Sequence, residues 1–366
     1  MKDKENYKSA LSVNIGIEQP AVTNKNAIEI LKKSKRKNHS AEQLANGILN
    51  GNRTLLSMAI TLIESNLPEH IEKAHDIINL CLPSSGNSIR IGITGVPGVG
   101  KSSFIESFGK FLTSNGYKVA VLAIDPSSER SKGSILGDKT RMEALAIDKN
   151  AFIRPSPSAG SLGGVARKTR ETVFLCEAAG FNVIIIETVG VGQSETTVHS
   201  MVDFFLLLML AGAGDELQGI KRGIMEMADL IAITKADGSN VQKAGLARTE
   251  YAGALHLFPP TESGWIPDVI TCSARQKTGI ETIWEKINEY KKITFQNGYF
   301  ERRRISQRES WMFETIEDLL KLNFYSHPSV ANALQEIKSR VLDKEICSYT
   351  AAEKLLTEYY KKFGRD

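Results

Sequence analysis

The chain has 366 residues, of which 42% are hydrophobic and 24% charged, as is typical of a globular protein with a central domain and smaller appendages. Residues 1–40 hold nine basic and four acidic side chains, a net charge of +5, so the rest of the chain is near −1 of the total of +4 and lacks the basic stripe that nucleic-acid binding needs. No apolar run approaches the ~18 residues of a membrane span. Four widely separated cysteines favour a reduced, cytoplasmic location. We expect no nucleic-acid and no membrane partner.

The N-terminal part of the chain predicts a tail followed by helices. Residues 1–40 predict a basic flexible tail without the apolar segment of a secretory signal. Residues 41–86 carry apolar side chains at helical spacing, which predicts a small N-terminal helical segment. Its second helix begins at Pro68 and runs through Leu82.

The central and C-terminal parts differ in their periodicity. Residues 87–295 alternate short apolar runs with helical patterns, which predicts an α/β domain with a mainly parallel sheet flanked by helices. Residues 300–366 predict helices only, with Ser348 as the cap of the last one. These helices are expected over Arg308–Phe324, Pro328–Leu342 and Tyr349–Phe363.

The central domain opens with a phosphate-binding motif. Residues 95–103 read Gly-Val-Pro-Gly-Val-Gly-Lys-Ser-Ser, a full match to G-x-x-x-x-G-K-[ST] between a strand pattern and a helix pattern. Lys101 supplies a cation for the β- and γ-phosphates, and the Ser102 hydroxyl is available to Mg²⁺. The sequence therefore predicts a P-loop NTPase. The expected nucleotide-binding residues of the loop are Gly95, Val96, Pro97, Gly98, Val99, Gly100, Lys101, Ser102 and Ser103.

Two later segments indicate which base is bound. Thr234-Lys235-Ala236-Asp237 follows an apolar run, where GTPases carry Asn-Lys-x-Asp. The Asp237 carboxylate can accept hydrogen bonds from N–H groups that guanine has and adenine lacks, and Lys235 would lie along the base plane. A second segment resembles the loop whose backbone N–H groups bind the guanine carbonyl, and it consists of Ser273, Ala274 and Arg275. We therefore expect GTP and GDP as ligands.

Acidic residues after other strand patterns predict a magnesium site. Glu187 follows the apolar run 181–186 and begins Glu-x-x-Gly, where most GTPases carry Asp-x-x-Gly. Asp125 follows another apolar run, and Asp138 lies thirteen residues later. Either aspartate alone is commonly a loop cap, but beside a phosphate loop both are candidate Mg²⁺ ligands, together with Ser102.

Three residues are the catalytic candidates. Lys101 would stabilise the charge on the γ-phosphate, and Glu187 would act at the metal. Gln193 is a weak candidate for positioning the attacking water. No residue stands out as a strong general base. Slow intrinsic turnover, raised by a partner, is the expected behaviour of a switch protein.

The motifs together resemble the MeaB/ArgK family, the methylmalonyl-CoA mutase-associated GTPases, whose human relative is the methylmalonic aciduria type A protein. The resemblance runs from about residue 41 to the C-terminus. It implies a GTPase chaperone that gates cofactor loading of an adenosylcobalamin-dependent acyl-CoA mutase and protects that enzyme, and a homodimer formed through the C-terminal helices. The partner-responsive switch of the family matches residues 210–221, with Asp215, Glu216, Gln218 and Lys221 as its polar members.

Two alternatives stay open. The first is a P-loop kinase or ATPase linked to lysine, arginine and ornithine transport, an older description of the same family. The second is a metal-insertion GTPase, which would be expected to carry a Cys/His cluster near the nucleotide. In this chain the six histidines and four cysteines are scattered along the sequence.

Overall fold

Seven short strands form one parallel sheet in the computed structural model, which describes residues 39–124, 142–155, 162–188, 194–212 and 222–361. The spatial order is β3-β2-β4-β1-β5-β6-β7, and every neighbouring pair is parallel. The expectation of an α/β fold with a mainly parallel sheet is confirmed. In chain order the strands are β1 (Ile89–Gly95), β2 (Val119–Ile124), β3 (Ala151–Arg154), β4 (Val183–Thr188), β5 (Phe204–Leu210), β6 (Leu230–Thr234) and β7 (Asp268–Thr271).

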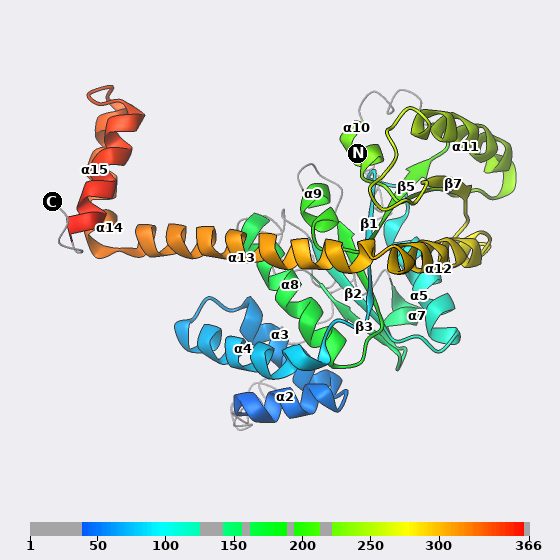
Figure 1. Ribbon diagram of the computed structural model, residues 1–366, viewed down its shortest axis with the longest axis horizontal. Coiled ribbons are helices and arrows are strands. Elements are labelled where there is room, and N and C mark those ends of the chain that lie inside the picture. The colour runs from blue at the N-terminus through cyan, green and yellow to red at the C-terminus, as the bar shows by residue number, and fades with distance from the viewer. Residues whose placement is uncertain (1–38, 125–141, 156–161, 189–193, 213–221, 362–366) are drawn as a thin grey trace, which may run out of the picture. The chain divides into compact units, whose positions relative to one another are not determined.

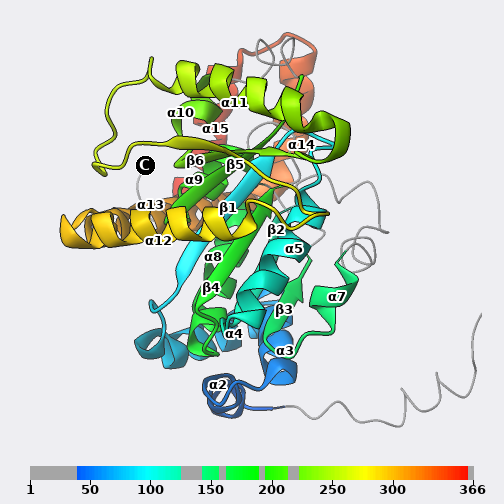
Figure 2. The same cartoon turned by 90° about the vertical axis from the view of Figure 1, so that its right-hand side faces the viewer.

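Helices cover both faces of this sheet, which is why its central strands are apolar on both sides. Figures 1 and 2 show these two layers of helices with the sheet between them. One face packs against α5 (Lys101–Ser114), α7 (Glu143–Ala146) and α12 (Ile280–Gln296). The other face packs against α8 (Leu162–Ala178), α9 (Ser194–His199), α10 (Arg222–Glu226) and α11 (Val241–Leu255). Because all strands run in one direction, their carboxyl ends share one edge, where ligands bind in folds of this kind.

The N-terminal segment contains three helices where the sequence predicted two. They are α2 (Ala41–Leu49), α3 (Arg53–Glu64) and α4 (Pro68–Cys81), followed by the 3₁₀ turn η1 (Leu82–Ser84). The extra break occurs because the Asn52 side chain accepts hydrogen bonds from the backbone N–H groups of Thr54 and Leu55 and so starts a new helix. Their apolar faces pack against α8 and β2.

The C-terminal part is helical, as expected, but its first helix is longer. These helices are α13 (Tyr299–Ser326), α14 (Pro328–Leu342) and α15 (Ser348–Tyr360). Figure 1 shows α13 crossing the sheet domain and continuing beyond it, with α14 and α15 at its far end. The expected cap at Ser348 is wrong: the cap is Cys347, whose Sγ accepts from the Thr350 N–H at 3.5 Å.

A buried ion pair fastens α13 to the sheet. The Arg304 guanidinium lies 2.6 Å from the Asp203 carboxylate and also donates to the carbonyls of Gly86 and Ser88 at 2.5 and 2.7 Å. Asp203 precedes β5 and accepts from the backbone N–H of Arg90 in β1 at 2.8 Å. Among the described helices none is long and apolar enough to cross a membrane.

Candidate nucleotide-binding site

The predicted phosphate loop connects β1 to α5 at the carboxyl edge of the sheet. A Cβ at Gly95 would lie 2.4 Å from the Leu208 carbonyl oxygen, so no side chain fits there. Gly98 and Gly100 have φ angles of +78° and +92°, a conformation that favours glycine. No side chain caps the N-terminus of α5. Its first N–H groups therefore remain available to an anion, which the helix dipole also attracts.

Lys101 is the first residue of α5, and its ammonium group lies inside the loop. Nζ donates to the Gly95 carbonyl oxygen at 2.7 Å. Burial lowers the pKa of Lys101, while the negative charges of Glu187 and Glu195 act in the opposite direction. Two carboxylates therefore favour the charged form of a half-buried lysine. The sequence singled out Glu187 but not Glu195.

The predicted base-binding segment contacts the phosphate loop directly. The Thr234 hydroxyl, at the end of β6, donates to the Val99 carbonyl at 2.8 Å and to the Met209 carbonyl at 3.2 Å. Lys235 Nζ donates to the Gly98 carbonyl at 2.8 Å. Thr234, which departs from the usual Asn, thus fixes the relative position of the two segments, a role that no motif predicts.

The two segments predicted to bind guanine also contact each other. The Ser273 hydroxyl donates to the Asp237 carboxylate and accepts from the Gln276 N–H at 3.1 Å. Ser273 is fully buried, Ala274 and Asp237 are half-buried, and Arg275 is exposed. The Ala236 N–H donates to the Cys272 carbonyl at 3.0 Å. Segments 36 residues apart therefore form one polar surface next to the phosphate loop.

Glu187 lies at the carboxyl end of β4, beside the loop. Its register partners are Ile93 in β1 and Ala123 in β2, and it is only 7% exposed. The next residue, Thr188, donates to the Thr94 hydroxyl at 2.8 Å. A buried carboxylate within the electrostatic range of Lys101, together with a serine hydroxyl on α5, is an oxygen donor set that suits Mg²⁺.

Several predicted site residues lie outside the described residues. They are Asp125 and Asp138 of the metal site, Gln193 of the catalytic set, and Asp215, Glu216, Gln218 and Lys221 of the partner switch. Within the described part of the chain, no three His, Cys, Asp or Glu side chains gather as a metal cluster.

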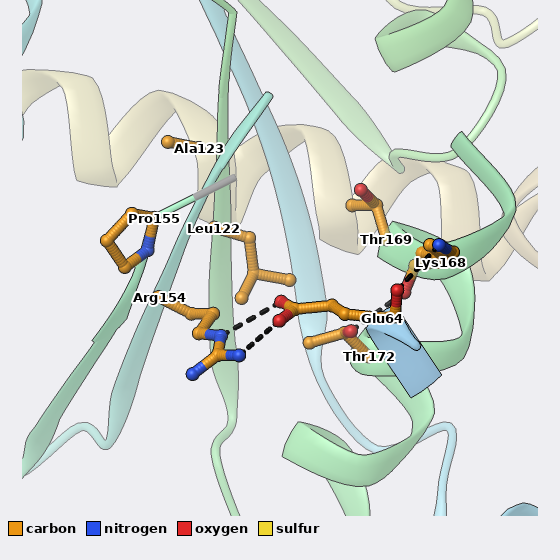
Figure 3. A pocket seen from close by; sticks show the side chains of 8 residues that line it. All are labelled: Glu64, Leu122, Ala123, Arg154, Pro155, Lys168, Thr169 and Thr172. Atoms are coloured by element: carbon orange, nitrogen blue, oxygen red, sulfur yellow. Dashed lines mark hydrogen bonds and ion pairs between the residues drawn. The ribbon is translucent and has the colours of Figure 1, made fainter. Parts of the chain in front are cut away.

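A small polar pocket lies on the opposite side of β2 and β3 from α5, and Figure 3 shows its lining. The Arg154 guanidinium donates to both carboxylate oxygens of Glu64, the last residue of α3. Lys168 Nζ donates to the Glu64 carbonyl at 2.7 Å and to Asn66 at 2.8 Å. Arg154 is thus paired with Glu64, and Lys168 donates to two neutral oxygens. These contacts connect α3, β3 and α8, so the pocket is structural rather than a ligand site.

Comparisons with known proteins agree on one family. A family model described as "Methylmalonyl Co-A mutase-associated GTPase MeaB" matches residues 56–329. "GTPase ArgK" of Escherichia coli is 44% identical over 314 residues, which cover 85% of this chain and 95% of that protein. "Methylmalonic aciduria type A homolog, mitochondrial" of Mus musculus is 43% identical over 336 residues, covering 89% and 81%. The solved structure of a protein named "LAO/AO transport system kinase" has a TM-score of 0.68 and 37% identity, covering 88% of this chain and 97% of that one.

Proposed function

The chain belongs to the MeaB family of methylmalonyl-CoA mutase-associated GTPases, and from this premise we propose that it is a GTP-driven chaperone of an adenosylcobalamin-dependent acyl-CoA mutase. It is a GTPase, as the family and the relatives named for that activity establish. The proposed cycle uses GTP binding and hydrolysis to gate cofactor loading and to protect the mutase. The name of the mammalian relative, which refers to methylmalonic aciduria, supports a client of the methylmalonyl-CoA mutase type.

One observation supports the nucleotide site above all others. Lys235 and Thr234, from the base-recognition segment, donate to carbonyls of the phosphate loop at 2.8 Å. The loop and the base segment are thus held in a fixed relation at the carboxyl edge of the sheet. A GTP molecule would have its phosphates over Gly95–Ser103 and its base against Lys235, Asp237 and Ser273–Arg275.

The residues of the chain have distinct tasks in this proposal. The N–H groups of the loop and the Lys101 ammonium stabilise the negative charge that shifts as water attacks the γ-phosphate. Asp237 accepts from the ring N–H and amine of guanine, and the Ser273 hydroxyl orients that carboxylate. Gln193 stays a candidate for positioning the attacking water.

We propose that Mg²⁺ is held by Ser102, Asp125, Asp138 and Glu187. The buried Glu187 carboxylate beside Lys101 supports this assignment. When bound, the ion neutralises phosphate charge and orients the β- and γ-oxygens. Glu187 is held in place by its position within β4, since Ile93 and Ala123 pair with it on both sides.

Coupling to the mutase is assigned to residues 210–221, with Asp215, Glu216, Gln218 and Lys221 as the responsive side chains. The segment follows β5 at the ligand edge of the sheet, where a polar loop can contact both nucleotide and partner. We keep the division into a tail (1–40), an N-terminal helical segment (41–86), a GTPase domain (87–295) and a C-terminal helical region (300–366).

The four free cysteines support a cytoplasmic location.

We propose a homodimer formed through α13 to α15. These helices expose many large apolar side chains, at 45–72% of their surface, namely Ile305, Met312, Phe313, Ile316, Leu319, Leu320, Leu322, Tyr325, Leu342, Tyr349 and Tyr360. An exposed apolar surface of this extent is typical of an interaction site.

The transport-kinase reading is the second candidate, and it rests on the name of a structural relative. A kinase would need a pocket for a phosphate acceptor beside the loop. The small pocket of Figure 3 does not provide one, because its cations are paired with Glu64 and Asn66.

The test is direct binding of the purified chain to the cognate mutase, followed by calorimetry in the presence of GDP or a non-hydrolysable GTP analogue. We expect a complex whose affinity depends on the nucleotide. Absence of binding in every nucleotide state would overturn the chaperone assignment, whereas transfer of the γ-phosphate to an amino acid would favour the kinase.

A further inference from the structure

A buried glutamate to which the sequence patterns assign no role lies near the phosphate loop. Glu195, in the first turn of α9, is 5% exposed. Its Oε2 atom is buried and has no hydrogen-bond partner among the described residues. An ionised oxygen in such a place lowers stability unless a cation or a donor faces it. We therefore expect a cation or a hydrogen-bond donor near the Glu195 carboxylate.

The packing of α9 indicates where Glu195 lies. A Cβ at Gly92 would lie 2.9 Å from Val198 Cγ1, so α9 sits directly on β1 at this glycine. Glu195 is three residues before Val198 and therefore on the same face of the helix, one turn earlier. The chain enters α9 from the carboxyl end of β4, so this earlier turn lies nearer the edge where Gly95 and Lys101 are found.

Lys101 is a described cation within the electrostatic range of Glu195. The charges of Glu187 and Glu195 both favour the protonated form of this lysine, which burial disfavours. The alternation of side chains along the strand places Ile93 and Glu187 on the face that carries α5, while α9 covers the opposite face. Lys101 thus experiences one carboxylate from each side of the sheet.

A carboxylate so close to a bound triphosphate would repel it unless a cation lies between the two. We propose that Glu195 is a positioning residue for GTP hydrolysis, which holds the Lys101 ammonium at the place where it meets the γ-phosphate. Glu195 contacts neither substrate nor metal in this role. Its negative charge restrains the cation that does contact the substrate.

The primary test compares Glu195→Gln with the native protein in single-turnover hydrolysis of GTP and in binding of a non-hydrolysable GTP analogue. A group that contacts the transition state directly is worth about 10²–10³ in rate. A group acting through Lys101 is expected to lower hydrolysis by about tenfold. Analogue affinity should stay equal or become tighter, because a negative charge near the phosphates has been removed.

Two control variants separate positioning from folding. Glu195→Asp keeps the charge and should retain more activity than Glu195→Gln. Glu250→Gln, on the exposed surface of α11, should behave as the native protein. A native hydrolysis rate in Glu195→Gln overturns the proposal. So does a joint loss of rate, analogue affinity and melting temperature that Glu195→Asp does not relieve, since that pattern indicates a structural role.

A double-mutant cycle tests whether Glu195 acts through Lys101. In the Lys101→Ala background the Glu195 carboxylate has lost the Lys101 cation and repels the phosphates. Glu195→Gln should therefore tighten analogue binding by about tenfold in this background, and should change it little when Lys101 is present. Equal effects in both backgrounds would overturn the coupling. Failure of this coupling can be distinguished from failure of the phosphate-site assignment. If the loop is not the phosphate site, the Lys101→Ala variant alone will bind and hydrolyse GTP normally.

Discussion

At the scale of single residues, the chemistry depends most on Lys101. Its ammonium lies inside the loop at 2.7 Å from the Gly95 carbonyl, and we propose that it contacts the β- and γ-phosphates. Lys101→Ala should therefore reduce GTP hydrolysis by at least about 10²-fold, measured as phosphate release. The exposed Lys243→Ala on α11 is the matched control. Native turnover in Lys101→Ala would exclude this loop as the active site.

Asp237 carries the base specificity of the proposal. Asp237→Asn replaces two acceptor oxygens by one acceptor and one donor, so the fit to guanine is lost and the carbonyl of xanthine is accepted. GTP affinity should fall by roughly ten- to hundredfold, the range of a charged hydrogen bond of 1.5–3 kcal/mol. Xanthosine triphosphate should bind the variant better than the native protein. Calorimetry with GTP, ATP and xanthosine triphosphate checks this, and equal native affinity for ATP and GTP would contradict the assignment.

His199, the last residue of α9, predicts a pH dependence of stability. Burial, and then the positive charge of Arg303, lowers the pKa of His199 to about 4. Arg303 Nη2 lies 3.2 Å from Nε2 of the ring, which therefore accepts and is neutral in the folded protein. The unfolded chain binds a proton near pH 6.5, so stability from this group is complete above pH 6.5 and is lost as the pH falls toward 4.

The difference in unfolding free energy between the native protein and His199→Gln should therefore grow from pH 4 to 6.5, by about 3 kcal/mol at most. Denaturant titrations at several pH values measure it. Asp229 also lies within the electrostatic range of Arg303, and burial raises the pKa of Asp229 to about 6. The stability from Asp229 changes with pH in the opposite direction, but this contribution is the same in both proteins and cancels in the difference. A difference that does not change with pH would contradict the account.

Motifs fix both residue type and spacing at Lys101 and Ser273, and the structure shows Lys101 bonded to Gly95 and Ser273 bonded to Asp237, while the roles of both residues in nucleotide binding stay predictions. Sequence motifs did not predict the roles of residues that depend on tertiary packing. Thr234 reads as an imperfect Asn, yet its hydroxyl joins two backbone carbonyls from different segments. Glu195 reads as one more acid in a helix, and only the packing of α9 on Gly92 brings it near Lys101.

At the scale of elements, α13 exposes the apolar surface through which we propose that the dimer forms. Ile316 and Leu320 lie one turn apart and are 45% and 61% exposed. Ile316→Lys with Leu320→Lys places two charges on this face, so a dimer formed there should dissociate to monomers while GTP hydrolysis persists. Light scattering after size exclusion measures the mass. Leu246→Lys on α11, where the native side chain is 68% exposed, is the control that should remain dimeric.

Element boundaries show what local sequence can and cannot predict. The helix over Pro328–Leu342 was predicted with both ends correct, because Pro328 occupies the first turn. The break at Asn52 and the cap at Cys347 were missed, since side-chain capping competes with helical periodicity and a cysteine is a rare cap. Helix α13 begins nine residues before the expected Arg308. Its buried Arg304 and Gln307 contact Asp203 and Val202, which a hydrophobic pattern cannot reveal.

At the scale of the whole molecule, the fold class followed from the alternation of strands and helices, but the strand order did not. The order β3-β2-β4-β1-β5-β6-β7 brings the ends of β1, β4 and β6 to one edge. That arrangement depends on contacts between segments far apart in the sequence, such as the packing of α9 against Gly92 and the ion pair between Arg304 and Asp203. The same arrangement places the loop after β1, the acid of β4 and the predicted base segment of β6 where the proposed site needs them.

The most direct test of the central claim is the rate of GTP hydrolysis with and without the cognate acyl-CoA mutase. Coupling between a nucleotide site and a partner typically amounts to about 1–3 kcal/mol, or roughly 5- to 150-fold. We predict stimulation within that range, saturating with mutase concentration and absent in Lys101→Ala. A turnover of GTP that stays the same at saturating mutase, although the two proteins form a complex, would contradict the account.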